Sequence, residues 1–387
     1  MPNRFLFLFL FVFIIFAVVG GVLLFGQDAQ ENEQSQNTQE NEQIQDTQRP
    51  STKDVMPKDN VDTYTVIADN LEIPWDIAFL PDGDIVATER NGTLSRIRKD
   101  GTRIHITQVG AHHRGEGGLL GVAIHPLFEE NNYIYLYSTQ QIEQGTINRV
   151  ERFTLHDTDL SNNKVIIDTI PGAIYHDGGR IDFGPDGYLY ITTGDATTPN
   201  ISQDRNSLAG KILRVTDEGA PAPNNPFGSA IFSLGHRNPQ GLAWDKDGTL
   251  WSTEHGRSGS LSGLDEINKI QPGTNYGWPL LQGSETESGF VAPVLHSGSE
   301  TWAPASASFV GDTLFFGGLR GSALYGYNIH TGTLKKFYTD TFGRIRTVRY
   351  HEAENALYIT TSNRDGRGDP LLGDDKIIKI PVDVLSM

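Results

Sequence analysis

Cysteine is absent from this chain of 387 residues. Without thiols the protein cannot form disulfides, use a cysteine nucleophile or bind a metal through thiolates. Any metal ion must therefore be held by oxygen or nitrogen ligands. Apolar residues are also sparse, at 37% of the chain, whereas glycine is abundant, at 42 residues, and aromatic residues make up 10%. This composition favours many short strands joined by tight turns.

Positive charge is in short supply as well. The chain has 31 lysines and arginines against 48 aspartates and glutamates, which gives a net charge of −17. This balance argues against a nucleic-acid-binding protein, because such proteins bind largely by neutralising phosphates. Three catalytic motifs are missing too: the GxxxxGK[ST] phosphate-binding loop, the HExxH zinc motif and the GxSxG turn of serine hydrolases.

One long apolar run is present, from Phe5 to Phe25. Its 21 residues suffice to span a bilayer as a helix, whereas the apolar core of a secretory signal usually has about 7 to 15. We therefore predict that residues 1–26 form an uncleaved membrane anchor. Arg4 favours a cytoplasmic N-terminus, which places the rest of the chain in the periplasm or the extracellular space. The small residues of Ala17–Gly21 leave open a cleaved signal and a secreted protein.

Residues 27–60 form a polar segment that contains a tandem repeat. The repeat reads QENEQSQNT at 30–38 and QENEQIQDT at 39–47. Because so few apolar side chains cannot offset the entropy of ordering, we predict a disordered linker; a glutamine-rich aggregation or partner-binding segment is the alternative. The first 60 residues hold four basic and eight acidic side chains, so the remaining chain carries a net charge of −13.

From residue 61 onward the sequence repeats one unit: an apolar strand, a turn and a second apolar strand. Asp-Gly turns recur between these strands, because glycine accepts the positive φ of a tight hairpin. The six turns lie near Pro81–Gly83, Pro126–Leu127, Pro185–Gly187, Lys246–Gly248, Gly311–Asp312 and Glu352–Ala353. The strands expected after them are 84–88, 133–137, 188–192, 249–252, 313–316 and 356–360. Without any long helical period, six such units predict an all-β fold for 61–387, a six-bladed β-propeller of four-stranded blades.

A propeller binds ligands at the loops between its blades, and four loops here combine charged residues and glycine in ways that a simple connector would not need. The first, YHDGGR at 175–180, holds His176 beside flexible glycines, which suits a general base. The second holds Arg237 and Asn238, which are donors for an anionic or carbonyl-rich ligand. The structural alternatives are a histidine hydrogen-bonded at a blade edge and an arginine that links two blades.

The third loop, Gly343–Arg346, places two arginines two residues apart. Strand alternation would put Arg344 and Arg346 on one face, where their repulsion favours a carboxylate-rich ligand between them. Salt bridges to the many acidic residues are the alternative. The fourth loop, residues 254–279, is rich in oxygen ligands that suit a hard cation such as Ca²⁺; an ordinary solvated acidic loop is the alternative.

Seven strings of the chain, spread in order over residues 64–382, carry a family likeness. They are PWDIAFLPDG (74–83), GEGGLLGVAIHP (115–126), HDGGRIDFGPDGYLYITTGD (176–195), QDRNSLAGKILR (203–214), GHRNPQGLAW (235–244), LDEINKIQPGTNYGWP (264–279) and GRIRTV (343–348). Together they resemble the soluble pyrroloquinoline quinone (PQQ)-dependent sugar dehydrogenases, which include the glucose/sorbosone and aldose sugar dehydrogenases. The resemblance implies a six-bladed propeller, in agreement with the repeat count.

The resemblance also implies roles for residues at the quinone. His176 would be the general base, and Arg237 and Asn238 would hold the reactive quinone oxygens. Arg237 would also stabilise the negative charge that develops on one of these oxygens during reaction. Arg344 and Arg346 would bind the carboxylates of PQQ.

The same resemblance implies two calcium ions. A catalytic Ca²⁺ would bind the quinone and the backbone carbonyls of Gly256 and Arg257. A second, structural Ca²⁺ would bind the carboxylate of Glu266 and the carbonyl of Tyr276.

Three positions depart from the family pattern. The lysine that binds PQQ corresponds to Arg320, which keeps the charge but changes the reach and the hydrogen-bond geometry. The proline after the calcium-binding glycine corresponds to Arg257, which still offers its carbonyl. A glutamine near the cofactor of glucose-oxidising members corresponds to Glu116, which adds a negative charge near an anionic cofactor.

The function implied is oxidation of the anomeric hydroxyl of an aldose to a lactone, with hydride transfer to PQQ and an external electron acceptor. Two alternatives remain. A lactonase-like calcium hydrolase would need a carboxylate-lined metal site, and the paired Arg344 and Arg346 argue against it. A non-catalytic extracellular binding propeller would show a degraded cofactor site, whereas His176, Arg237 and Asn238 are all retained.

Overall fold

The computed structural model describes residues 63–386, and its strands and short helices run from Thr65 to Val384. The predicted membrane anchor, 1–26, and the predicted linker, 27–60, lie outside the described residues. Within 63–386, no helix has both the length and the apolar character needed to cross a membrane.

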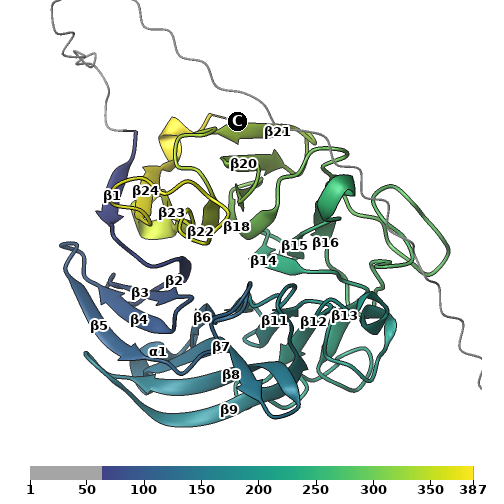
Figure 1. Cartoon of the computed structure of the whole chain (residues 1–387), viewed down its shortest axis with the longest axis horizontal. Helices are drawn as coiled ribbons and strands as arrows, with labels where there is room; N and C mark the ends of the chain where they lie inside the picture. The colour runs from purple at the N-terminus through teal and green to yellow at the C-terminus, as the bar shows by residue number, and fades with distance from the viewer. Residues whose placement is uncertain (1–62, 387) are drawn as a thin grey trace, which may run out of the picture. The chain divides into compact units, whose positions relative to one another are not determined.

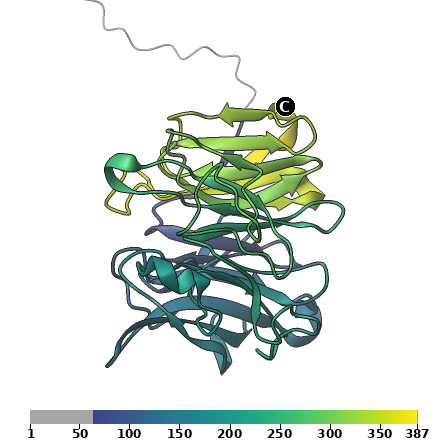
Figure 2. The ribbon, with the colours of Figure 1, turned by 90° about the vertical axis from the view of Figure 1, so that its right-hand side faces the viewer.

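Six four-stranded antiparallel sheets follow one another around a central axis (Figure 1). The six-bladed β-propeller predicted from the hairpin repeat is therefore confirmed. Seen from the side, the strands run across the view and the connecting loops collect at the two ends of the ring (Figure 2).

Five blades follow the order of the chain, and the first strand of each lies nearest the axis. The first two consist of β2 (Pro74–Phe79), β3 (Ile85–Glu89), β4 (Thr93–Ile97) and β5 (Arg103–Gln108), then β6 (Leu119–Ile124), β7 (Tyr133–Ile142), β8 (Gly145–Leu155) and β9 (Leu160–Pro171). The third consists of β10 (Ile181–Phe183), β11 (Leu189–Thr193), β12 (Lys211–Val215) and β13 (Ile231–Leu234). The fourth and fifth consist of β14 (Pro239–Trp244), β15 (Leu250–Glu254), β16 (Glu266–Lys269) and β17 (Leu295–His296), then β18 (Pro304–Val310), β19 (Thr313–Gly318), β20 (Ala323–Asn328) and β21 (Leu334–Phe337).

The sixth blade closes the ring with strands from both ends of the propeller. It consists of β22 (Ile345–His351), β23 (Ala356–Thr361), β24 (Ile377–Pro381) and β1 (Thr65–Ala68). Strand β1 pairs antiparallel with β24, Thr65 opposite Lys379, and is the outermost strand. The first strand of the chain therefore links the N-terminal end of the propeller to its C-terminal blade, which leaves no open seam in the ring.

The six strands predicted after turns are the second strands of the six blades: β3, β7, β11, β15, β19 and β23. Two of the predicted turns contain a short helix instead of a simple hairpin. These are α1 (Phe128–Asn131), after Pro126, and η3 (Glu352–Glu354). The other helices described are single turns: η1 (Pro199–Gln203), η2 (Gly259–Leu261) and η4 (Val382–Val384).

Apolar side chains fill the spaces between neighbouring blades. Leu94 of blade 1 packs in one cluster with Val122 of blade 2, and Phe315 of blade 5 packs with Ile359 of blade 6. Near the axis, by contrast, the contacts are charged. Asp76 on β2 is buried and forms ion pairs with Arg180, a buried residue that precedes β10, and with Arg349, a half-buried residue on β22. These pairs join the innermost strands of three blades and hold the loops at the ends of the ring in register.

Candidate active site

Two kinds of loop meet at one end of the ring, around a cavity of about 230 Å³. One kind joins successive blades, and the other joins the second and third strands within a blade. The cavity is lined by seven of the residues selected from the sequence: Glu116, His176, Arg237, Gly256, Arg257, Arg320 and Arg344. Residues separated by more than 200 positions in the chain therefore share one wall.

His176 is held by two hydrogen-bonded neighbours. Its Nδ1 lies 2.7 Å from Oδ1 of Asp195, a fully buried carboxylate in the loop between β11 and β12. The other oxygen of Asp195 accepts a hydrogen bond of 2.8 Å from Nε1 of Trp278. A carboxylate can only accept, so Nδ1 of His176 carries the proton and Nε2 of the neutral ring is free to accept one. This arrangement suits a general base.

Glu116 supports the same histidine from the other side. One oxygen of its carboxylate accepts the backbone N–H of His176 at 3.0 Å, and the other binds Nη1 of Arg367 at 2.9 Å. Burial opposes ionisation, but His255, the His176 N–H and Arg367 outweigh it and lower the pKa of Glu116 to about 2. Glu116 is therefore a carboxylate at neutral pH.

Arg237 and Asn238 lie in the loop between β13 and β14, and both are buried. The guanidinium of Arg237 lies over the Trp278 ring, 5.3 Å from its centroid, and donates to Oγ of Ser258 at 2.8 Å. Oδ1 of Asn238 accepts the backbone N–H of Gly178 at 3.0 Å. Nε of Arg237 and Nδ2 of Asn238 are buried and have no partner among the described residues. Each side chain thus keeps one buried donor that the described residues do not satisfy, and Arg237 lines the cavity whereas Asn238 does not.

The pair of arginines from the third loop has a mixed outcome. Strand β22 begins at Ile345, and a bulge follows, so simple alternation does not place Arg344 and Arg346 on one face as predicted. Arg344 lies in the preceding loop and forms an ion pair of 2.7 Å with Asp365, which is the salt-bridge alternative.

Arg346, in contrast, has no ion-pair partner within residues 63–386. Its Nη1 donates to Oε1 of Gln240 at 2.6 Å, its guanidinium lies 5.6 Å from the centre of the Trp75 ring, and its Nε is unpaired. Burial is the main cause that lowers the pKa of Arg346 to about 9, and the charge of Arg344 adds to it. Arg346 is a buried cation that a bound anion would stabilise.

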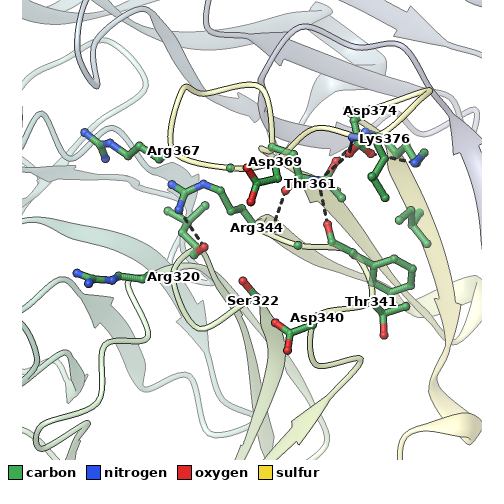
Figure 3. Close-up of a pocket in the computed structure, with 17 residues that line it drawn as sticks. Arg320, Ser322, Asp340, Thr341, Arg344, Thr361, Arg367, Asp369, Asp374 and Lys376 are labelled. Carbon is green, nitrogen blue, oxygen red and sulfur yellow. Dashed lines mark hydrogen bonds and ion pairs between the residues drawn. The ribbon is translucent and has the colours of Figure 1, made fainter. Parts of the chain in front are cut away.

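A second cavity, of about 350 Å³, adjoins the first and shares Leu319, Arg320, Arg344 and Arg367 with it. In Figure 3 the side chains of Arg320 and Arg367 extend to the same side, away from Asp374 and Lys376. Arg320 is exposed, donates to Oγ of Ser262 at 3.3 Å and forms no ion pair in the part of the chain described. Both arginines thus turn their charge toward the first cavity.

The four predicted metal residues line a third, atom-sized cavity of about 10 Å³, together with Glu254. They are Gly256, Arg257, Glu266 and Tyr276. A Cβ on Gly256 would lie 2.2 Å from the carbonyl oxygen of Leu264, so only glycine fits this close approach.

Burial and the charge of Glu254 raise the pKa of Glu266 to about 8. Within 63–386, no group of three or more histidine, aspartate or glutamate side chains has the spacing of metal ligands, so a cation there would depend largely on backbone carbonyls.

Sequence comparison identifies the family. A sequence model described as Glucose / Sorbosone dehydrogenase matches residues 71–373. The chain belongs to the glucose/sorbosone dehydrogenase family. Membership confirms the predicted resemblance and the predicted enzyme class, an oxidoreductase.

Solved structures agree with this family assignment. The PQQ-bound form of aldose sugar dehydrogenase from Streptomyces coelicolor is 38% identical, with a TM-score of 0.77 over 82% of this chain and 96% of that one. A putative oxidoreductase (glucose dehydrogenase) from Thermus thermophilus is 42% identical, with a TM-score of 0.76 over 82% and 99%. Quinoprotein glucose dehydrogenase B of Acinetobacter calcoaceticus is 33% identical over 58% of this chain and 54% of that protein.

Sequence reasoning missed several residues that shape the site of this dehydrogenase. Asp195 and Trp278 lie in two of the strings that carry the family likeness, so their position was a signal that could have been used. Arg367 lies in a polar stretch whose sequence has no motif that would have marked it as a site residue. His255 lines both the main cavity and the atom-sized one; burial lowers its pKa to about 3, so its ring is neutral at neutral pH.

Proposed function

We propose that this dehydrogenase oxidises the anomeric hydroxyl of an aldose to a lactone, with PQQ and Ca²⁺ as cofactors and an external electron acceptor. The observation that carries the proposal is the cavity itself. In it a histidine with a free Nε2, oriented by Asp195, lies on the same wall as Arg237, whose Nε is buried and unpaired.

The donors present fit an anionic quinone with carboxylate substituents. Arg237 and Asn238 would hold the quinone oxygens, and Arg320, Arg344 and Arg346 would hold the carboxylates. Buried unpaired donors on Arg237, Asn238 and Arg346 support this assignment, since such atoms are normally satisfied by a partner. When bound, PQQ supplies the electrophilic carbonyl that takes up the hydride.

The residues of the chain would handle the proton and the developing charge. Nε2 of His176 would accept the proton of the anomeric hydroxyl, and the carboxylate of Asp195 would stabilise the resulting imidazolium. The fixed charge of Arg237 would stabilise negative charge that develops beside it. Oxidation of the aldose removes two electrons and two protons, and the external acceptor receives the electrons.

The test is reconstitution of the full-length protein with PQQ and Ca²⁺, followed by aldose-dependent reduction of a redox dye. We expect dye reduction only when PQQ, Ca²⁺ and an aldose are all present. Absence of PQQ binding even at large cofactor excess would overturn the proposal in favour of a non-catalytic propeller. Location outside the cytoplasm rests on residues 1–26 and stays a prediction.

The calcium part of the proposal has its own prediction. Gly256, Arg257, Glu266 and Tyr276 would hold Ca²⁺, so adding Ca²⁺ should raise the melting temperature by about 5 °C, as expected for a ligand well above its Kd. Glu266→Gln should remove most of this increase. The matched control is Glu300→Gln, because Glu300 is exposed and pairs only with Lys336 and Trp302. An equal increase in wild type and Glu266→Gln would contradict the assignment of Glu266.

A further inference from the structure

One contact spans the mouth of the cavity and is not explained by the roles assigned so far. Arg367 lies in the loop between β23 and β24 of blade 6, and Glu116 lies in the loop that joins blades 1 and 2. Their side chains meet with Nη1 of Arg367 2.9 Å from Oε1 of Glu116. The guanidinium of Arg367 also lies over the ring of Tyr175, 5.6 Å from its centroid.

A second contact of Glu116 links this ion pair to His176, the proposed base. The second oxygen of Glu116 accepts the backbone N–H of His176 at 3.0 Å. His176 has a φ of 65°, in the left-handed region, which is costly for a residue with a Cβ and is maintained only by surrounding contacts. Arg367, Glu116 and the backbone of His176 therefore form one chain of contacts.

The pair also balances charge inside the cavity. Glu116 places a full negative charge on the wall that would hold an anionic cofactor, and its side chain is only 15% exposed. The charged and titratable groups that interact with this carboxylate are Arg367, His255, Arg90, Arg237, Arg346 and Asp177. Among these, Arg367 is the only one with an ion pair to Glu116 in the described part of the chain.

We propose that Arg367 is a positioning residue that neutralises Glu116, so that Glu116 can hold the His176 backbone without repelling the anionic cofactor. The inference rests on the proposed function for its cofactor part only. An ordinary surface ion pair would contribute little to folding stability and have no effect on the site. The position of the pair, with Glu116 partly buried and joined to His176, distinguishes it from a surface pair.

The test uses four forms of the full-length protein: wild type, Arg367→Met, Glu116→Gln and the double variant. We expect Arg367→Met to weaken PQQ binding about tenfold or more, because it leaves a partly buried carboxylate uncompensated. Glu116→Gln removes the charge but keeps an amide oxygen that accepts the His176 N–H. The double variant should therefore bind PQQ within about threefold of wild type.

A matched control is Arg364→Met. Arg364 lies in the same loop, lines neither cavity, and donates to the backbone of Asp374. We expect it to bind PQQ as wild type does. If Arg367→Met also bound PQQ as wild type does, or if the double variant were as weak as Arg367→Met, neutralisation by Arg367 would be wrong.

A measurement without cofactor separates this inference from the proposed function. Amide hydrogen exchange of the His176 N–H in the PQQ-free protein should be about tenfold faster in Glu116→Ala than in wild type and almost unchanged in Glu116→Gln. Unchanged exchange in Glu116→Ala would overturn the part of the inference in which Glu116 holds the His176 backbone, even if the wild type oxidised aldoses. A wild type that bound no PQQ would instead refute the proposed function, and the exchange result would still decide whether Glu116 holds His176.

Discussion

Two groups of polar side chains at the candidate site differ in how completely they are hydrogen-bonded. On the base side, the group of Glu116, His176 and Asp195, each side chain is hydrogen-bonded to a neighbour. On the cationic side, the group of Arg237, Asn238 and Arg346, each side chain keeps a buried donor without a partner among residues 63–386; of these three, Arg237 lines the cavity. The base side is thus preorganised by the protein alone, whereas the cationic side is completed by a ligand.

This difference indicates how the site divides its work. A general base must be held in one tautomer and one orientation, so its bonds are internal to the protein. A binding surface must exchange protein contacts for ligand contacts, so donors that already had partners would have to give them up. Variants on the two sides should therefore fail in different ways.

The largest effect is expected on the base side. His176→Ala should lower turnover of an aldose roughly 10²- to 10⁴-fold, the usual contribution of a general base, while PQQ affinity stays close to wild type. Steady-state kinetics and PQQ titration measure the two quantities separately. The control is His105→Ala, because His105 lies exposed on β5. Turnover at the wild-type rate in His176→Ala would contradict the division between the two sides.

An intermediate effect is expected on the cationic side. Arg346→Met should weaken PQQ binding roughly ten- to a hundredfold, because it removes a cation that would bind a carboxylate of PQQ. Turnover at saturating PQQ should change little, because Arg346 has no ion-pair partner within residues 63–386 that would be left uncompensated. Arg344→Met should lower the melting temperature in addition to weakening PQQ binding, since it leaves Asp365 without its ion pair. If both variants lost only stability, the cationic side would have to be interpreted as structural.

The smallest effect concerns Asp177, the residue that follows His176 in the chain. Oδ2 of Asp177 is buried without a partner, and burial, only partly opposed by hydrogen bonds from Asn148 and Ala173, raises the pKa of Asp177 to about 6. The folded carboxyl therefore keeps its proton to about pH 6 and the unfolded one only to about pH 4, so folding stability falls as the pH rises through this interval. Asp177→Asn should lose about 1 to 3 kcal/mol less than wild type between pH 4 and 7, measured by denaturant unfolding. An identical pH dependence in both proteins would show that Asp177 does not titrate in this range.

The strand pattern was predictable because it depends on local chemistry. Apolar strands that follow turns indicate the second strand of each blade directly, with an Asp-Gly pair in three of the six turns, and all six strands lie where the sequence places them. The loop strings likewise located His176, Arg237 and Arg344 on one cavity. Two turns, after Pro126 and at Glu352, contain a helical turn because their residues permit both conformations.

The pairing of charges was not predictable, because it depends on which blades are neighbours in space. Nothing near Arg344 in the sequence indicates that Asp365 takes it as a partner while Arg346 stays unpaired. The ion pair between Glu116 and Arg367 joins residues that are 251 positions apart. Local sequence determined the six blades and the residue types in the loops of this dehydrogenase. Only closure of the ring decided which charges are neutralised and which remain for a ligand, because ion pairing depends on distances that the closed ring fixes.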